Sequence, residues 1–126
     1  MKVCVIQPHY SFDENDVGSC FAELMALLDR CDDSLDLIVL PEYSDVPADV
    51  PDKEAFYAAY YKNNAVLLDR AKETARRCHA IVFVNCGFMT DLGIRNTTYA
   101  IDREGNIVAK NVYGEELVRQ IEKLTL

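Results

Sequence analysis

A short apolar run that ends at a proline and a glutamate constrains the fold of this chain most strongly. Residues 35–40 (L-D-L-I-V-L) are nearly all apolar, and Pro41 and Glu42 follow directly. Proline has no backbone N–H to donate to a β-ladder, so a buried strand is expected to end there. Ligands of open α/β sheets bind beyond the carboxyl ends of the strands, which places Glu42 where a site is expected. A solvated loop carboxylate is the alternative interpretation.

Charge and composition exclude several classes of partner. The chain has 126 residues, which predicts one domain with its own core, and its net charge is −8. Nucleic acids and anionic membranes both require a basic face, so neither is an expected partner. No apolar stretch approaches membrane-spanning length.

Cysteine usage predicts a reducing compartment, and hence a cytoplasmic protein. The five cysteines form no C-x-x-C pair and several fall in apolar runs, as expected for small buried side chains. Cys78 and His79 are adjacent at a predicted helix end, and with His9 they have the wrong spacing for metal ligands. No metal or cofactor is expected.

The periodicity of apolar residues alternates between strand and helix patterns. A mixed sheet with helices on at least one face is expected, because crossover units come first and a hairpin follows. The first strand is expected to be central, and the third to be covered on both faces. The predicted elements are a strand at 3–6, a helix at 15–30, a strand ending at 40, a loop at 43–51, a helix at 52–78 that bends near 63–64, strands at 80–89, 95–102 and 107–112, and a short amphipathic helix at 114–126.

Several segments in this order resemble the nitrilase, or carbon–nitrogen hydrolase, superfamily. The segments are V-I-Q-P at the first strand, L-I-V-L-P-E-Y at residues 37–43, and R-N-T-T-Y-A-I-D-R-E-G-N-I-V-A-K at residues 95–110. The resemblance covers residues 1–112. It implies an α/β fold in which this chain is the N-terminal half of an α-β-β-α sandwich, with residues 113–126 lacking a family counterpart.

The family resemblance also implies hydrolysis of a small amide or nitrile by a Glu-Lys-Cys triad. A cysteine thiolate attacks the substrate carbon, a glutamate acts as general base, and a lysine stabilises the developing oxyanion. By this resemblance Glu42 is the general base. The family's lysine falls on Tyr113, and Lys110, the nearest amine, is three residues early, a shift that turns a strand side chain to the opposite face.

The family's nucleophile has no counterpart in these residues. Cys86, at the end of the third strand and followed by Gly87, is the best-placed substitute, and a buried structural cysteine is the alternative.

Two classes of function follow from this resemblance. In the first, the chain is a truncated or incomplete hydrolase, inactive alone, that self-associates or binds a complementary chain because one sheet face would be left bare. In the second, it is a non-catalytic domain that acts in binding or assembly. A third interpretation is an unrelated flavodoxin-like domain that binds a small ligand. The absence of a Gly-rich phosphate loop after the first strand disfavours it.

Overall fold

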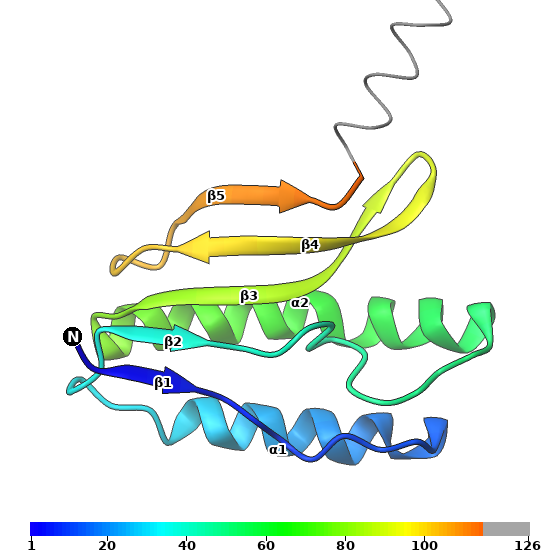
Figure 1. The fold of residues 1–126 in the computed structure, drawn as a ribbon, viewed down its shortest axis with the longest axis horizontal. Helices are drawn as coiled ribbons and strands as arrows, with labels where there is room; N and C mark the ends of the chain where they lie inside the picture. The colour runs from blue at the N-terminus through cyan, green and yellow to red at the C-terminus, as the bar shows by residue number, and fades with distance from the viewer. Residues whose placement is uncertain (115–126) are drawn as a thin grey trace, which may run out of the picture.

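The fold alternates strands and helices and then ends in antiparallel strands (Figure 1). The computed structural model describes residues 1–114, so the helix predicted for 114–126 lies outside the described residues. The elements are β1 (Val3–Val5), the 3-10 turn η1 (Glu14–Asp16), α1 (Val17–Asp29), β2 (Leu37–Val39), α2 (Lys53–Cys78), β3 (Ile81–Thr90), β4 (Gly93–Ile101) and β5 (Ile107–Val112).

The five strands form one mixed sheet in the order β1-β2-β3-β4-β5. The pairs β1–β2 and β2–β3 are parallel, and β3–β4 and β4–β5 are antiparallel, which confirms the predicted mixed α/β sheet. The prediction that the first strand is central was wrong. Each crossover helix adds the next strand on the same side, so within the described residues β1 lies at the edge of the sheet.

Local capping sets both ends of the long helix α2. The Asp52 carboxylate accepts hydrogen bonds from the N–H groups of Glu54 and Ala55, and His79 ends the helix in a left-handed conformation with a φ of 52°. The predicted bounds are therefore confirmed. The predicted bend near residues 63–64 is not observed as a break, because the helix is continuous through this point.

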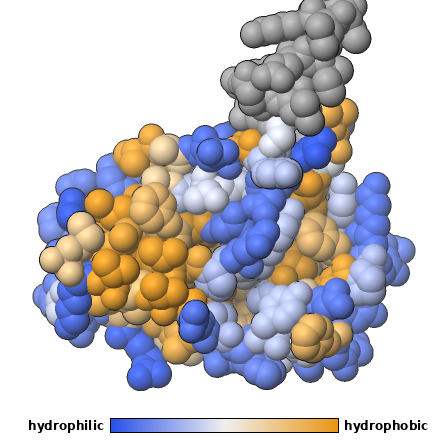
Figure 2. All heavy atoms as spheres, viewed as in Figure 1, coloured by the Kyte–Doolittle hydropathy of each residue, from blue (hydrophilic) through white to orange (hydrophobic). Residues whose placement is uncertain are grey.

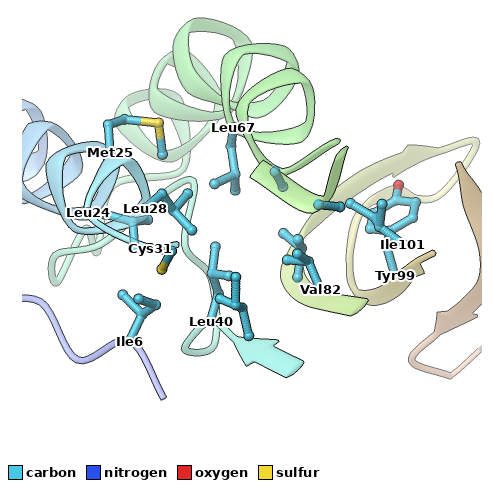
Figure 3. Close-up of a cluster of buried hydrophobic side chains, with 14 of the residues drawn as sticks. Ile6, Leu24, Met25, Leu28, Cys31, Leu40, Leu67, Val82, Tyr99 and Ile101 are labelled. Carbon is cyan, nitrogen blue, oxygen red and sulfur yellow. The ribbon is translucent and has the colours of Figure 1, made fainter. Parts of the chain in front are cut away.

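Both helices pack on the same face of the sheet. Residues paired across the strands in one register row, Cys4, Ile38, Val82 and Ile101, all contribute to the cluster of apolar side chains beneath the helices. Leu24 and Leu28 of α1 and Leu67 of α2 meet this row from the helix side (Figure 3). The core therefore lies between one sheet face and two helices.

The opposite face of the sheet, which we call the open face, is apolar, and no helix within residues 1–114 covers it. Its central register row is Val5, Val39, Phe83, Ala100 and Ala109. Val5 is 60% exposed and Phe83 is 38% exposed. In Figure 2 this face is toward the viewer and carries a broad apolar patch, while α2 lies behind the sheet in Figure 1. The prediction that the third strand is covered on both faces is thus wrong for the described residues.

We expect the buried leucines of α1 to carry much of the stability. Leu28→Ala should lower the free energy of unfolding by about 2–5 kcal/mol, because it opens a cavity at a fully buried position. Leu92→Ala, at a position 66% exposed in the β3–β4 turn, is the matched control and should change it by less than about 0.5 kcal/mol. Urea denaturation measures both, and equal losses would contradict the assigned core.

Candidate active site

Glu42 lies just beyond the carboxyl end of β2. The backbone N–H of Leu40 still donates to the Phe83 carbonyl oxygen over 3.0 Å, so β2 stays paired with β3 for one residue past its last assigned position. Pro41 then ends the pairing, and Glu42 is exposed at the start of the following loop. The prediction that residues 43–51 form a loop at this edge is confirmed.

Hydrogen bonds to β3 hold the start of this loop. The N–H of Tyr43 donates to Asn85 Oδ1 over 2.7 Å, and the N–H of Ser44 donates to the Asn85 carbonyl oxygen over 2.9 Å. Tyr43 adopts a left-handed conformation with a φ of 51°, which turns the chain away from the direction of β2. The backbone on both sides of Glu42 is therefore tied to β3.

The Glu42 carboxylate accepts a hydrogen bond from a side chain of β4. Asn96 Nδ2 donates to Glu42 Oε1 over 2.7 Å, and Asn85 Nδ2 donates to Asn96 Oδ1 over 2.6 Å and to Thr98 Oγ1 over 3.0 Å. The register Asn85–Thr98 and Gly87–Asn96 places these side chains on the open face, the side of Phe83. Glu42 thus lies where the carboxyl edge of the sheet meets the open face.

Asn85 and Asn96 were not among the site residues predicted from the sequence. One signal was present: Asn85 is the first polar residue after the apolar run 80–84, just beyond the part of β3 that pairs in parallel with β2. The role of Asn96 depends on the register of β4, which is a tertiary feature.

A groove of about 550 Å³ opens beside Glu42, a volume suited to a small organic ligand. Its walls are mainly apolar and aromatic, and the rings of Tyr43 and Phe56 pack edge to face with their centroids 5.6 Å apart. The loops after β1 and β2 and the start of α2 supply the lining, which includes Tyr10, Val46 and Asp49. Glu42 is therefore exposed to solvent and is also one of the residues that line a concave surface.

The structure does not bring Lys110 together with Glu42. Lys110 pairs with Tyr99 in the β4–β5 register, and Tyr99 is buried on the helix-facing side of the sheet. The Lys110 ammonium lies 3.9 Å from the centroid of the Phe88 ring, a cation–π contact on that same side. Its catalytic role stays a prediction.

Cys86 is likewise placed away from Glu42. Its side chain is fully buried in the core on the helix-facing side of the sheet. Burial raises the pKa of the Cys86 thiol, and the nearby Asp45 carboxylate raises it further. Because the thiolate is the nucleophilic form, this environment favours an inert thiol.

Asp45 is a buried carboxyl group that joins the loop to β3 and α2. Its Oδ2 atom accepts hydrogen bonds from the Gly87 N–H and from Asn64 Nδ2, both over 3.0 Å. Asn63 Nδ2 donates to the Asp45 carbonyl oxygen over 2.9 Å. The Oδ1 atom is buried and has no hydrogen-bond partner among residues 1–114, and burial raises the pKa of this carboxyl group. The two asparagines where a bend was predicted thus bind the loop.

Neither a membrane-spanning helix nor a metal cluster occurs in residues 1–114. No helix there is both long and apolar enough to cross a bilayer, and no three His, Cys, Asp or Glu side chains gather closely enough to hold a metal ion.

We expect Asp45→Asn to change how stability depends on pH. A carboxyl group whose pKa is raised on folding stabilises most below its unfolded pKa, near 3.8, and this contribution is lost as the pH rises through the folded pKa. The variant cannot ionise, so its free energy of unfolding should improve relative to the wild type between about pH 4 and pH 7. Urea denaturation across this range measures the difference, with Asp49→Asn in the same loop as the exposed control. A constant difference at all pH values would contradict the prediction.

Comparison with known proteins finds similarity in structure but not in sequence. No family model and no curated protein matches the chain. The NitFhit protein of C. elegans has the same fold with a TM-score of 0.67 and 17% identity, and the match covers 87% of this chain and 26% of that one.

Two further solved structures show the same fold. One is an amidase of the nitrilase superfamily from Nesterenkonia sp. Its TM-score is 0.59 at 15% sequence identity, and the match covers 89% of this chain and 42% of the amidase. The other is a carbon–nitrogen hydrolase from Helicobacter pylori G27. Its TM-score is 0.59 at 14% sequence identity, and the match covers 87% of this chain and 38% of the hydrolase. This chain therefore spans less than half the length of each of the three proteins.

Proposed function

We propose that this chain, which has the α/β fold of carbon–nitrogen hydrolases, provides the general base of an amidase- or nitrilase-type active site. The observation that supports this proposal most strongly is the geometry of Glu42. The residue lies beyond the carboxyl end of β2, its carboxylate accepts a hydrogen bond from Asn96, and it is one of the residues that line a groove of about 550 Å³. The proposed substrate is a small amide or nitrile. The similar solved structures, amidases and carbon–nitrogen hydrolases, support this class of reaction.

In the proposed mechanism Glu42 moves protons at the reacting centre. For an amide substrate, its carboxylate takes the proton from a cysteine thiol as the sulfur attacks the carbonyl carbon, and a lysine stabilises the oxyanion that forms. Glu42 then gives the proton to the leaving amine, so that a thioester remains on the cysteine. Finally it takes a proton from a water molecule that attacks the thioester and returns that proton to the departing sulfur, which releases the acid and restores the free thiol and the Glu42 carboxylate.

The proposed nucleophile and lysine come from polypeptide other than residues 1–114. Lys110 and Cys86 both lie on the helix-facing side, whereas Glu42 and its partner Asn96 lie at the open face. The exposed apolar row that includes Val5 and Phe83 is a surface that another sheet would cover. A sheet packed there, from further polypeptide, a complementary chain or a second copy, brings its own side chains next to Glu42.

A second candidate function is a non-catalytic binding or assembly domain. The observation that favours it is the separation of Glu42 from both Lys110 and Cys86 by the sheet itself. In that case the open face still binds a partner, and the groove beside Glu42 holds a ligand without hydrolysing it.

We expect the purified chain alone to release no ammonia from small amides or nitriles. Together with a polypeptide that supplies the lysine and cysteine it should do so, and Glu42→Gln should lower kcat by about 10²–10⁴-fold, the usual contribution of a general base. Glu54→Gln, at an exposed position in the first turn of α2, is the matched control. Turnover by the Glu42→Gln assembly at the wild-type rate would refute the role of Glu42, and binding of the second polypeptide without any turnover would favour the non-catalytic function.

We expect the open face to bind protein. Sedimentation of the purified wild-type chain should show self-association or a bound second polypeptide. Association is favourable because it removes the apolar surface of the open face from water. Phe83→Lys should abolish this association, while Leu92→Lys, an equally apolar but isolated exposed position, should not. A wild-type chain that stays monomeric, alone and in mixtures, would contradict the prediction.

A further inference from the structure

We infer that Asn85 and Asn96 form an amide relay that orients the Glu42 carboxylate and commits its Oε1 atom, which leaves Oε2 to carry the proton. The relay is the hydrogen-bonded path Tyr43 N–H, Asn85, Asn96, Glu42. The effect of the relay on catalysis rests on the proposed function. Its existence does not, and can be tested on the purified chain without any activity. In these terms Asn85 and Asn96 are positioning residues.

A backbone N–H fixes the direction of the first amide. The N–H of Tyr43 can only donate, so the atom of Asn85 that lies 2.7 Å from it must be the oxygen, Oδ1. The Asn85 amide nitrogen is then on the other side of the group, 2.6 Å from Asn96 and 3.0 Å from Thr98 Oγ1. The orientation follows from this donor and needs no choice between the two amide flips.

The second amide is fixed by the first. Because Asn85 Nδ2 donates, the atom of Asn96 that faces it must be Oδ1, and the remaining Asn96 atom is the donor Nδ2. That nitrogen lies 2.7 Å from Glu42 Oε1. Reversing either amide would set two donors or two acceptors against each other. The relay therefore presents an N–H donor, and no acceptor, to Glu42.

The relay and the backbone of residues 42 and 43 together form a closed ring of covalent and hydrogen bonds. It begins at the N–H of Tyr43, the peptide group directly after Glu42, and it ends at the Glu42 carboxylate. Asn85 and Asn96 are held on paired strands, and the Asn96 carbonyl oxygen also accepts the Tyr113 N–H over 2.8 Å. Both ends of the Glu42 side chain are thus tied to the same rigid part of the sheet, which restricts its rotamers.

This arrangement has a chemical consequence for a general base. A donor at Oε1 holds the carboxylate in one orientation, which a group that accepts a proton requires. Among the residues that the structure describes, only Oε1 has a side-chain partner, so Oε2 is the free oxygen. A base must place one lone pair within hydrogen-bond reach of the proton that it removes, and the relay fixes which lone pair that is.

NMR of the full chain tests the relay without any activity. We expect the side-chain amide signals of Asn96, and more weakly those of Asn85, to move with pH as Glu42 gains its proton, and to lose that response in Glu42→Gln. Glu42 is exposed, so this substitution should not disturb the fold. If the Asn96 amide of the wild-type chain does not respond to Glu42, or responds equally in Glu42→Gln, the relay is refuted.

A single isosteric change should reverse the relay. In Asn85→Asp, the carboxylate still accepts the Tyr43 N–H but presents an acceptor to Asn96, so the Asn96 amide must turn over and direct its oxygen at Glu42. The Asn96 signals should then stop following Glu42. Asn111→Asp is the matched control, because Asn111 pairs with Thr98 on the same open face but lies outside the relay. An unchanged Asn96 response in a folded Asn85→Asp chain would overturn the inference.

Kinetics in a hydrolytically active assembly separate the relay from the proposed function. Asn85→Asp should lower kcat by about 10²-fold with little change in KM, since a misdirected base affects the proton transfer more than substrate binding. Asn106→Asp, the same isosteric change at an exposed position in the turn between β4 and β5, should keep wild-type kcat. Activity that depends on Glu42 but is indifferent to Asn85→Asp would refute the relay alone. Activity that is indifferent to Glu42→Gln would refute the proposed function, and the NMR result would then decide the relay by itself.

Discussion

Parallel pairing between β2 and β3 determines where every other part of the candidate site lies. The pairing continues past β2 through the Leu40 N–H and resumes after Pro41 at the Ser44 N–H, which donates to the Asn85 carbonyl oxygen. Glu42 lies in the two-residue gap between Leu40 and the Tyr43–Ser44 contacts. Its backbone is therefore held by the sheet although its side chain is exposed, a combination that suits a group that must meet a substrate.

The two faces of the sheet have different surroundings and so suit different roles. The helix-facing side buries the apolar side chains that stabilise the fold, and it also buries Cys86, whose thiol is kept neutral there. The open side carries an apolar row and, at its carboxyl edge, the polar cluster of Glu42, Asn85 and Asn96. A partner that covers the open face would also cover this cluster, which lowers the local dielectric and strengthens its hydrogen bonds.

Asp45 shows that the loop after β2 carries a cost in stability. In the part of the chain that the structure describes, one oxygen of its buried carboxyl group has no hydrogen-bond partner, and burial disfavours the charged form of this group. In return, its other oxygen ties the loop to Gly87 of β3 and Asn64 of α2. A destabilising group in a loop that shapes a groove is typical of functional regions, where position takes precedence over stability.

The sequence by itself determined the elements, because apolar periodicity, proline positions and capping residues such as Asp52 act over a few residues. It also placed Glu42 at the carboxyl end of a strand, since Pro41 marks that end locally. Within residues 1–114, the tertiary structure alone decided the edge position of β1, the exposure of one face of β3, and the contact between Asn96 and Glu42, which are 54 residues apart in the chain. Strand order and register depend on which segments pair across long loops, and one residue of shift would turn Asn96 to the other face.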